Sequence, residues 1–458
     1  MNVPLPRKTA VPDDRSCQGS RPRQARSGRL GILPGQIAVL RDSDTERTHA
    51  GMAASSTDNL RVAIVGGGIG GLAAAAHLHR AGFRPVVYEQ ARVLGEVGAG
   101  LVLAPNAVRL LRRLGVLGEL AGRAVPLAVG WEFRRWEDGR VLSAEDLAGS
   151  CERLYGERTY TVHRADLHSA IAAAVPPGTI RLGAACTGVS VRGDIAALSF
   201  ADGTAAEADV VIGADGVHSA VRGAVTEPSP ATYSGICAFR AIVPADRAPA
   251  FSLRPAQTLW LGPGHHLVHY PISGGTAVNL VAFAPAGDYT VESWSATATV
   301  AEFLAEFAGW DRRLRNLIRQ AGTPGRWALL DRAPLTRWSR GPVTLLGDAA
   351  HPMFPFFAQG AAQSIEDAAV LARCLAQDTQ DPASALRRYE SLRLARTTRL
   401  QAVSHARAHV NHLPDGPEQE GRDVSLASAD PLTASAWIYG YDPDTDDMER
   451  TPNGNRFH

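Results

Sequence analysis

The sequence predicts an α/β fold in which a discontinuous parallel-sheet domain is interrupted by an antiparallel β-sheet and completed by C-terminal helices. Three observations predict it. Short apolar strands recur at residues 60–65, 208–216 and 341–350, and each runs into a glycine-rich or acidic turn. Between the last two, residues 230–300 carry β-type runs separated by Gly and Pro, which is typical of an antiparallel sheet. Residues 365–410 show a helical pattern.

Length and composition indicate an ordinary globular protein. The 458 residues, with 45% hydrophobic and 20% charged side chains, are enough for two or three domains of about 150 residues. The formal net charge of +1 gives no electrostatic case for a nucleic-acid partner or an anionic membrane surface. No apolar run approaches the roughly 20 residues that cross a bilayer. We therefore predict neither nucleic acid nor membrane as a partner.

The cysteines indicate a reducing compartment. The five are scattered, and none has the close, paired spacing of a disulfide scaffold or a structural zinc site. Isolated buried thiols are the better interpretation, and a cytoplasmic location follows from it. The five are Cys17, Cys151, Cys186, Cys237 and Cys374.

Residues 1–58 differ in composition from the rest of the chain. They are rich in Arg, Pro, Gly and Ser with little periodicity, which is typical of a disordered extension. Acidic residues such as Asp13 and Asp14 argue against a transit peptide, and there is no apolar core for a secretory signal. Met52 stands just before the first strand-like segment, so an over-long translation start covering residues 1–51 is the alternative. We favour the disordered extension.

A dinucleotide-binding unit opens the part of the chain with regular patterns. The apolar run 60–65 is followed by a glycine turn, an Ala- and Leu-rich helix and a second strand at 85–89. In the turn, Gly66 permits the tight bend, Gly68 lets the backbone approach a pyrophosphate, and Gly71 allows close packing of helix on strand. The start of the helix then offers its unpaired N–H groups to the phosphates.

Glu89 completes this fingerprint at the end of the second strand. A carboxylate about 20 residues after the glycines can accept hydrogen bonds from ribose hydroxyls. An acid at this place favours a ribose without a 2′-phosphate. The predicted ligand is therefore FAD or NAD.

Two further strands end in an acid. Asp215 and Gly216 close the strand at 208–216, and Asp348 follows the strand at 341–350. Ligands of open α/β sheets bind at the carboxyl ends of the strands. For Asp215 alone, an ordinary turn with an Asp cap is an equally good interpretation. Three such strand ends in one chain favour a shared ligand site.

Together these motifs resemble the single-component FAD-dependent aromatic hydroxylases of the p-hydroxybenzoate hydroxylase fold, and most closely the salicylate hydroxylase-like branch. The resemblance covers about residues 60–445. The motifs that carry it are the glycine fingerprint with Glu89, "HRADL" (163–167), "GADGVHSAVR" (213–222) and "GDAAHPMFPFFAQGAAQSIEDA" (347–368). Near the C-terminus, "HLPDGPEQ" and "WIYGYDP" are similar to that branch in particular.

The resemblance implies a discontinuous Rossmann-like FAD-binding domain with an inserted antiparallel β-sheet substrate domain and C-terminal helices. The predicted boundaries are 59–228 for the first part of the FAD-binding domain (with some substrate-domain strands near 125–160), 229–335 for the β-rich substrate-binding domain, 336–412 for the second part of the FAD-binding domain with a C-terminal helix, and 413–458 for a tail.

The resemblance also implies cofactor contacts. Glu89 would bind the adenosine ribose, Arg164 would lie near the FAD phosphates, and Asp348 would hold the ribityl or phosphate region. Ala99 and Gly100 would line the cofactor.

Two further pairs of residues belong to this set. Asp215 and Gly216 are part of a motif linked to the handling of both FAD and NAD(P)H. Gly360 and Ala361 would offer backbone N–H groups to the pyrimidine edge of the flavin. Because those groups open a helix, the helix dipole would stabilise the negative charge of reduced flavin.

The reaction implied is hydroxylation of a small electron-rich aromatic compound of the salicylate-like, aminobenzoate or hydroxypyridine class. NADH or NADPH reduces FAD, O2 adds to form a C4a-hydroperoxyflavin, and the distal oxygen passes to the ring. The protein supplies orientation, electrostatics and a dry pocket. The expected partners are the aromatic substrate, O2 and NAD(P)H, and the expected assembly is a monomer or homodimer.

The substrate pocket is where the sequence departs from several relatives. Gly235 and Phe239 stand where some related hydroxylases carry a His and a Tyr four residues apart. Phe356 and Phe357 stand where some salicylate hydroxylases have a His. A recognisable base for a phenol is therefore missing, which argues against salicylate itself. Phe239, Phe356 and Phe357 are candidates for the apolar wall of the pocket.

Two residues in the same turn are candidates for a catalytic role. Gln359 is its one polar side chain, and related enzymes use a Gln at this place to hydrogen-bond the substrate. Pro355 precedes the two phenylalanines and is a candidate for contact with substrate or flavin.

Three histidines lie on the strand-like segment "GHHLVHYP". Alternation would put His265 and His269 on one face and His266 with Tyr270 on the other. No carboxylate is spaced with these histidines, so we predict no metal site. His269 or Arg240 is a candidate for the substrate pocket, although packing within the sheet is the better interpretation. His351 is expected to be structural.

Two alternatives to the aromatic hydroxylase remain. One is an epoxidase or N-heterocycle oxygenase on the same scaffold. The other is a non-catalytic FAD-binding relative, against which the intact glycine, Asp215 and Asp348 motifs argue.

Overall fold

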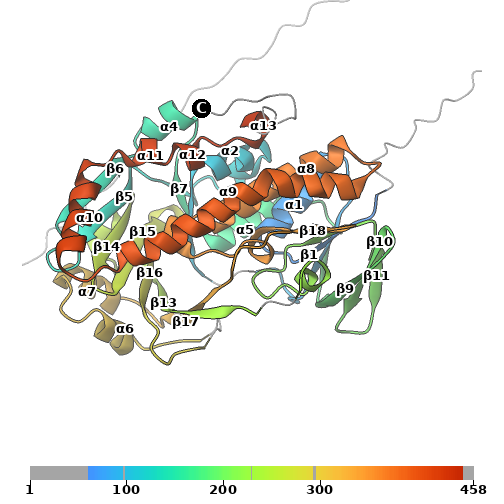
Figure 1. Ribbon diagram of the computed structural model, residues 1–458. Coiled ribbons are helices and arrows are strands. Elements are labelled where there is room, and N and C mark those ends of the chain that lie inside the picture. The colour runs from blue at the N-terminus through green and yellow to red at the C-terminus, as the bar shows by residue number, and fades with distance from the viewer. Residues whose placement is uncertain (1–59, 96–97, 228–229, 292–295, 447–458) are drawn as a thin grey trace, which may run out of the picture. The chain divides into compact units, whose positions relative to one another are not determined.

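The computed structural model describes residues 60–95, 98–227, 230–291 and 296–446. The extension predicted at residues 1–58 therefore lies outside the described residues. Within them, the predicted combination of a parallel sheet, an antiparallel sheet and C-terminal helices is confirmed (Figure 1).

A six-stranded, mostly parallel sheet forms the first layer. Its central strands come from distant parts of the chain, since β1 pairs with β2 on one side and β12 on the other, and β12 pairs with β19. Their apolar side chains are almost all buried, as expected for parallel strands covered on both faces. In order across the sheet, the strands are β18 (Ser339–Arg340), β19 (Val343–Leu345), β12 (Val210–Gly213), β1 (Val62–Val65), β2 (Val86–Glu89) and β8 (Ile180–Leu182).

Helices α1 (Ile69–Arg80) and α8 (Gly360–Gln377) pack on each other beside this sheet. α1 buries an unbroken run of alanines, 73–76, whose small side chains let neighbouring elements approach closely. The other helices in the first half of the chain are α2 (Pro105–Arg113), α3 (Val116–Glu119), α4 (Ser150–Tyr155) and α5 (Arg164–Ala173).

A seven-stranded sheet forms the second layer. β14 and β5 are parallel, and every other neighbouring pair is antiparallel. One face packs on α6 (Val300–Glu306) and α7 (Arg312–Arg319) through an apolar core. The strands in order are β17 (Gly325–Asp331), β13 (Thr232–Pro244), β16 (Ala277–Pro285), β15 (His265–Ile272), β14 (Ala256–Gly262), β5 (Val129–Arg135) and β6 (Val141–Asp146).

Two small sheets complete the strands of the described residues. One is built from β3 (Gly100–Leu103), β7 (Tyr160–His163) and β4 (Val125–Pro126), and the other from β11 (Ala205–Ala208), β10 (Ile195–Phe200) and β9 (Cys186–Arg192).

A long helix, α9 (Pro382–Asn411), connects the two layers. The side chain of Asp381 caps its start by accepting a hydrogen bond from the N–H of Ser384, and Pro382 occupies the first turn. Figure 1 shows α9 running from beside α8 toward α10 (Pro417–Ser428). α11 (Pro431–Ala434), α12 (Ala436–Tyr439) and α13 (Pro443–Asp446) follow. Across the described residues, no helix is both long enough and apolar enough to span a membrane.

Candidate active site

A cavity of about 580 Å³ lies where the carboxyl ends of the parallel strands meet one face of the seven-stranded sheet. The glycine turn after β1, the end of β12 and the start of α8 contribute to its wall. The sequence-predicted residues that line it are Gly66, Gly68, Glu89, Gly100, Arg164, Asp215, Gly216, Asp348, Pro355, Phe356, Gly360 and Ala361.

The three glycines of the fingerprint do different things. Gly66 has φ of +104°, and a Cβ there would lie 2.4 Å from the carbonyl oxygen of Ala214. A Cβ at Gly71 would lie 1.9 Å from the carbonyl oxygen of Gly66. A Cβ at Gly68 would meet nothing within 4 Å. The outer two glycines are therefore needed for packing, and the middle one faces open space where a ligand can approach the backbone.

Glu89 holds the glycine turn while it lines the cavity. Its Oε2 accepts a hydrogen bond of 2.6 Å from the N–H of Gly67, and its Oε1 accepts one of 2.7 Å from the N–H of Ala91. His168, buried beneath, lies with Nε2 2.7 Å from the carbonyl oxygen of Gly67. The carboxylate is thus fixed at the wall, with lone pairs left for a ribose.

Asp215 is both a cap and a cavity residue. Its carboxylate accepts hydrogen bonds from the hydroxyl of Ser219 and the N–H of Ala220, at 2.6 and 2.7 Å, and so closes the turn after β12. Arg222 then reaches the third strand end, donating to the carbonyl oxygens of Ala349 and Asp348. The two interpretations of this acid, turn cap and ligand site, are therefore compatible.

Asp348 is exposed to the cavity, whereas its neighbours are buried. The turn that presents it is held from below by Asp367, which accepts hydrogen bonds from the N–H of Gly347 at 3.0 Å and from Nε2 of His351 at 2.6 Å. A structural role was expected for His351, and its buried pairing with Asp367 fits that role.

The start of α8 forms the next part of the wall. Gly360 and Ala361 line the cavity, but the side chain of Gln359 does not. Its Oε1 accepts hydrogen bonds from Nδ2 of Asn106 at 3.0 Å and from Nε2 of Gln363 at 3.2 Å. The side chain of Gln359 is therefore not placed to contact the substrate as expected, because its amide is held in the interior by Asn106 and Gln363.

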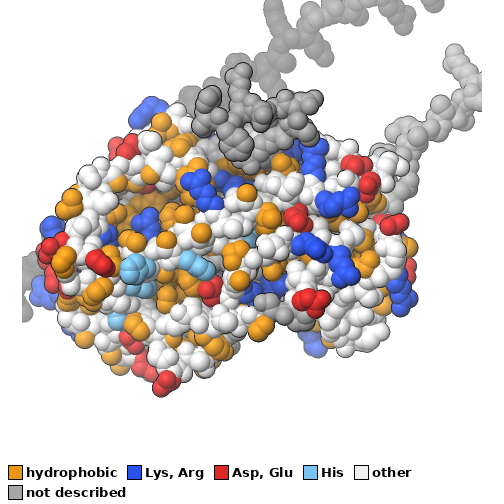
Figure 2. All heavy atoms as spheres, viewed as in Figure 1, with side chains coloured by type: hydrophobic (Ala, Val, Ile, Leu, Met, Phe, Trp, Pro, Cys, Tyr) orange, Lys and Arg blue, Asp and Glu red, His pale blue; other side chains and the backbone are white. Residues whose placement is uncertain are grey.

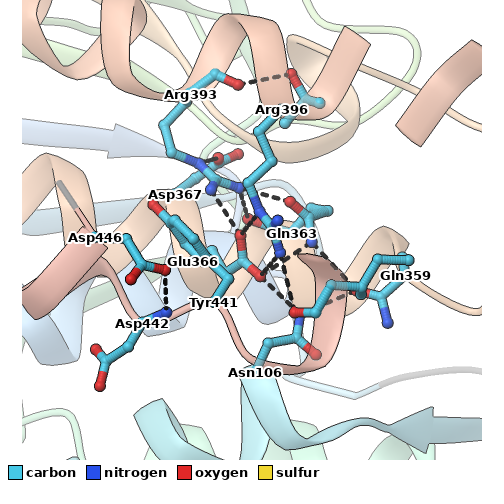
Figure 3. A network of polar contacts seen from close by, with 12 residues as sticks. Asn106, Gln359, Gln363, Glu366, Asp367, Arg393, Arg396, Tyr441, Asp442 and Asp446 are labelled. Atoms are coloured by element: carbon cyan, nitrogen blue, oxygen red, sulfur yellow. Dashed lines mark hydrogen bonds and ion pairs between the residues drawn. The ribbon is translucent and has the colours of Figure 1, made fainter. Parts of the chain in front are cut away.

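That network is buried and charged (Figure 3). Arg393 binds Glu366 at 2.6 Å and Asp367 at 2.7 Å, and all three side chains are fully buried. Arg396 adds a second cation on Glu366 at 2.8 Å. α9 is thereby anchored to the part of α8 that lies directly behind the cavity.

The face of the seven-stranded sheet supplies the opposite wall. Arg240, Val281 and Val268 lie directly across from one another on β13, β16 and β15. One row along, Phe283 is opposite His266, and in the other direction Asn279 is opposite Tyr270. All of these residues line the cavity, together with Leu259 and Gln257 of β14 and Trp327 of β17.

Two residues expected at the substrate pocket lie on the opposite face of this sheet. Phe239 is fully buried and stacks on Phe303 of α6, with ring centres 4.9 Å apart. His269 packs edge-on against Phe251 at 5.3 Å. For His269, this contact fits the favoured interpretation of packing within the sheet, and the alternative place in the substrate pocket is wrong. The cavity is lined instead by His266 and Tyr270, which alternation along β15 places on the other face.

The phenylalanines after Pro355 also separate. Phe356 lines the cavity, whereas Phe357 packs near Trp131, with ring centres 6.0 Å apart, and under the guanidinium of Arg407. Ala99, which was also expected to line the cofactor, is buried and does not line the cavity. Its carbonyl oxygen accepts a 2.7 Å hydrogen bond from the N–H of Arg164, which does line it.

Arg240, which the sequence offered as an alternative candidate for the substrate pocket, lines the cavity, whereas the sequence did not predict His266 there. The guanidinium carbon of Arg240 lies 4.8 Å from the centre of the Trp327 ring. Burial lowers the pKa of Arg240 to about 10, the nearby Tyr270 opposes this shift, and Arg164 adds to it. For His266, the alternation that groups it with Tyr270 along the strand is the signal that could have found it. Within the described ranges, no group of three or more His, Cys, Asp or Glu side chains is placed to hold a metal ion.

A family model described as an FAD binding domain matches residues 59–404. The chain belongs to this family. It is 46% identical over 401 residues to the 3-amino-4-hydroxybenzoate 2-monooxygenase PtmB3 of Streptomyces platensis, a match covering 88% of this chain and 99% of that protein. It is 38% identical to the 6-hydroxynicotinate 3-monooxygenase of Bordetella bronchiseptica, covering 78% and 94%.

Solved structures of the same fold agree with this membership. Klebsiella pneumoniae HpxO complexed with FAD and uric acid matches with a TM-score of 0.74 and 28% identity, over 83% of this chain and 96% of that one. A salicylate hydroxylase substrate complex matches with a TM-score of 0.71 and 26% identity, over 85% and 97%. The chain is therefore an FAD-dependent aromatic monooxygenase, as the sequence motifs predicted.

The cavity fits FAD on its own geometry. A Cβ at Gly68, Gly216 or Gly360 would meet nothing within 4 Å, so backbone from three separate turns faces the open space. Glu89 and Arg164 add an acceptor for a ribose and a cation for phosphates at the same wall.

Proposed function

We propose that this monooxygenase uses NADH or NADPH and O2 to hydroxylate a small aromatic carboxylate that carries a ring hydroxyl or amino group. 3-Amino-4-hydroxybenzoate is the first candidate, because two Streptomyces relatives at 46% and 41% identity are named for it. The observation that carries the proposal is Arg240, a cation on the sheet face of the cavity.

The cofactor half of the cavity would hold FAD through the residues already described. Bound FAD supplies the redox chemistry and the activated oxygen, which no side chain can supply. Gly68 would lie against the pyrophosphate, Glu89 would accept from the adenosine ribose, and Arg164 would face the phosphates. Asp348 would hold the ribityl region. Gly360 and Ala361, at the start of the 18-residue helix α8, would direct N–H groups and a positive dipole end at the flavin.

The sheet half of the cavity would hold the substrate. Arg240 would bind the substrate carboxylate in a bidentate pair, which strongly orients a planar acid. Trp327 limits the movement of the guanidinium by lying beneath it. Phe356, Phe283 and Val281 would cover the ring and exclude water from the reacting atoms.

A second candidate is an N-heterocyclic substrate. The 38% relative named 6-hydroxynicotinate 3-monooxygenase favours it, and hydroxynicotinate also offers a carboxylate to Arg240 and a ring hydroxyl beyond it.

The purified holoenzyme tests the proposal. O2 uptake would be measured with NADH and then NADPH, with 3-amino-4-hydroxybenzoate, 3-hydroxybenzoate and 6-hydroxynicotinate each added in turn. We expect at least one of the three to stimulate uptake and to gain one oxygen atom by mass spectrometry. O2 uptake that none of the three stimulates would overturn the proposed substrate class.

A further inference from the structure

His266 stands in the cavity wall and is joined to a second histidine behind it. Nδ1 of His266 lies 2.6 Å from Nε2 of His412, the residue that directly follows α9. The N–H of Gly264 donates to the carbonyl oxygen of His412 at 3.0 Å, so the start of β15 and the end of α9 are tied together. Because Nδ1 is engaged with His412, Nε2 is the His266 nitrogen available to a molecule in the cavity.

Two aromatic rings fix the His266 imidazole. It stacks on Phe283 with ring centres 4.5 Å apart and an interplanar angle of 24°, and Phe356 stands edge-on at 5.1 Å. The residue is only 1% exposed. Both phenylalanines also line the cavity, so the imidazole is part of the same wall that would cover a substrate ring.

His412 leads from this wall toward the outside. It is half-buried, whereas His266 is buried. Figure 2 shows histidine side chains at the surface around the C-terminal end of α9. The pair therefore connects the interior of the cavity to a region that water can reach.

The groups around the pair keep both rings neutral. Burial, then His412, Arg407 of α9 and the neighbouring His265 lower the pKa of His266 well below its ordinary value. Burial and His265 lower the pKa of His412 to about 4. Two neutral imidazoles sharing one hydrogen bond require one to donate and the other to accept. With His266 donating through Nδ1, its Nε2 carries a lone pair that can accept a proton.

The register of the sheet places His266 at a suitable distance from Arg240. Two strand spacings of about 4.8 Å and two residues of about 3.4 Å separate their Cα atoms, which gives roughly 12 Å on one face. A benzoate with a hydrogen bond at each end spans a comparable distance. With its carboxylate on Arg240, the far side of the ring would point toward His266.

We propose that His266 is a catalytic residue that takes the proton of the substrate's ring hydroxyl, and that His412 is a positioning residue that carries a proton onward to water. This inference rests on the proposed function and deepens it. The O–H bond of the substrate breaks as an N–H bond forms at Nε2 of His266. The proton on Nδ1 of His266 passes to Nε2 of His412, which releases a proton from Nδ1.

The transfer serves the reaction because a phenolate ring is a stronger nucleophile toward electrophilic oxygen than a phenol. Without substrate, the two histidines are weak bases. The phenolate that forms beside His266 counteracts this, because a negative charge next to an imidazolium raises the pKa of the imidazolium. At the two sequence positions where some related hydroxylases carry a His and a Tyr, this chain has Gly235 and Phe239, so His266 would supply the base from a different strand.

The test compares three variants of the holoenzyme: His266→Gln, His412→Gln and His409→Gln. His409 is the matched control, since it is exposed and lies on the last turn of α9. The probe is 3-amino-4-hydroxybenzoate. Its near-ultraviolet difference spectrum, followed against pH, reports the ionisation of the bound hydroxyl, and flavin fluorescence reports FAD binding. Product formed per NAD(P)H consumed reports coupling.

We expect His266→Gln to raise the apparent pKa of the bound hydroxyl by at least one unit and to lower product per NAD(P)H at least tenfold, with FAD affinity unchanged. His412→Gln should also raise the apparent pKa of the bound hydroxyl and lower product per NAD(P)H. Product per NAD(P)H should recover in part at higher pH. His409→Gln should match the wild type. If His266→Gln fails to bind FAD, the ionisation and coupling measured in His412→Gln alone decide whether the relay operates.

Unchanged ionisation and coupling in the deciding variants would overturn the relay while leaving the hydroxylase intact. A wild-type protein that neither binds nor hydroxylates any aromatic carboxylate would instead overturn the proposed function, and the relay with it.

Discussion

The guanidinium of Arg396 lies over the ring of Tyr441, with its central carbon 4.0 Å from the ring centre. The same guanidinium binds the buried carboxylate of Glu366 (Figure 3). It also donates to the carbonyl oxygens of Trp437 and Ile438. The C-terminal motif "WIYGYDP" is thereby tied to α8, whose first residues face the cavity. This contact gives a physical role to a motif that the sequence identified only by resemblance.

Removing the Tyr441 ring should loosen the start of α8. We expect Tyr441→Ala to lower the free energy of unfolding by about 2–4 kcal/mol, because a buried aromatic ring and its cation contact are lost together. FAD should also dissociate more readily. Thermal unfolding and flavin fluorescence measure the two effects. Tyr441→Phe, which keeps the ring, should retain most of the stability, and equal losses in both variants would contradict this role.

Arg393 neutralises two buried carboxylates. Arg393→Leu leaves Glu366 with Arg396 as its cation and removes the arginine from Asp367, which keeps its hydrogen bond with His351. We expect a loss of about 3–5 kcal/mol in urea unfolding. Arg388→Leu is the control on the same helix, since Arg388 is exposed and should cost at most about 0.5 kcal/mol. A similar stability for the two variants would show that the buried cluster is not paired as described.

The shifted pKa of the Asp367 carboxyl makes the stability of the fold depend on pH. Burial would raise its pKa, but His351 and Arg393 outweigh burial and hold the pKa at about 2. A depressed carboxylate pKa stabilises the fold above its unfolded value near pH 4, and that contribution, roughly 2 kcal/mol, is lost as pH falls toward 2. The difference in unfolding free energy between wild type and Asp367→Asn should therefore shrink between pH 5 and pH 2. A difference that stays constant would refute the assignment.

The glycine turn allows binding and packing to be separated. Gly68→Val adds atoms that point into open space, so the fold should survive while FAD affinity falls at least tenfold. Gly71→Ala places Cβ against the carbonyl oxygen of Gly66 and should destabilise the protein itself. Thermal unfolding without added FAD, beside a fluorescence titration, distinguishes the two. The reverse pattern would mean that Gly68 does not face the cofactor.

Arg240→Gln tests the carboxylate site. Loss of a charge-assisted pair of about 1.5–3 kcal/mol corresponds to a roughly 10- to 100-fold higher KM for a benzoate substrate. FAD binding should be unchanged. Arg254→Gln is the control, because Arg254 pairs with Glu132 at a partly exposed site that does not line the cavity. An unchanged KM in Arg240→Gln would place the carboxylate elsewhere.

The cofactor half of the site could be predicted because its signals are local. Gly66, Gly68 and Glu89 belong to one short βαβ unit, in which turn geometry and strand length dictate where each residue lies. Asp348 likewise follows a strand directly. Relationships of this kind are set within a few residues of sequence.

The residues of the substrate half could not be predicted from local sequence in the same way. The face of β15 that meets the cavity is the one not covered by α6 and α7. The packing of those helices is a tertiary contact that the local sequence of β15 does not determine. On β13, the pairing shifts between Tyr233 and Cys237, and Gly235 adopts φ of +78°, so counting alternate residues across this stretch does not fix the facing of Phe239. His266 meets a partner 146 residues away, and no periodicity encodes that contact.

The origin of the oxygen atom added to the product is the most direct test of the proposed hydroxylation. The holoenzyme would be incubated with 3-amino-4-hydroxybenzoate, NADH or NADPH, and ¹⁸O2 in ordinary water, and the product analysed by mass spectrometry. We expect a hydroxylated product that carries one ¹⁸O atom, formed only when the aromatic acid and the nicotinamide are both present. A product whose new oxygen comes from water, or no oxygenated product from any aromatic acid of the panel, would contradict the proposed hydroxylation.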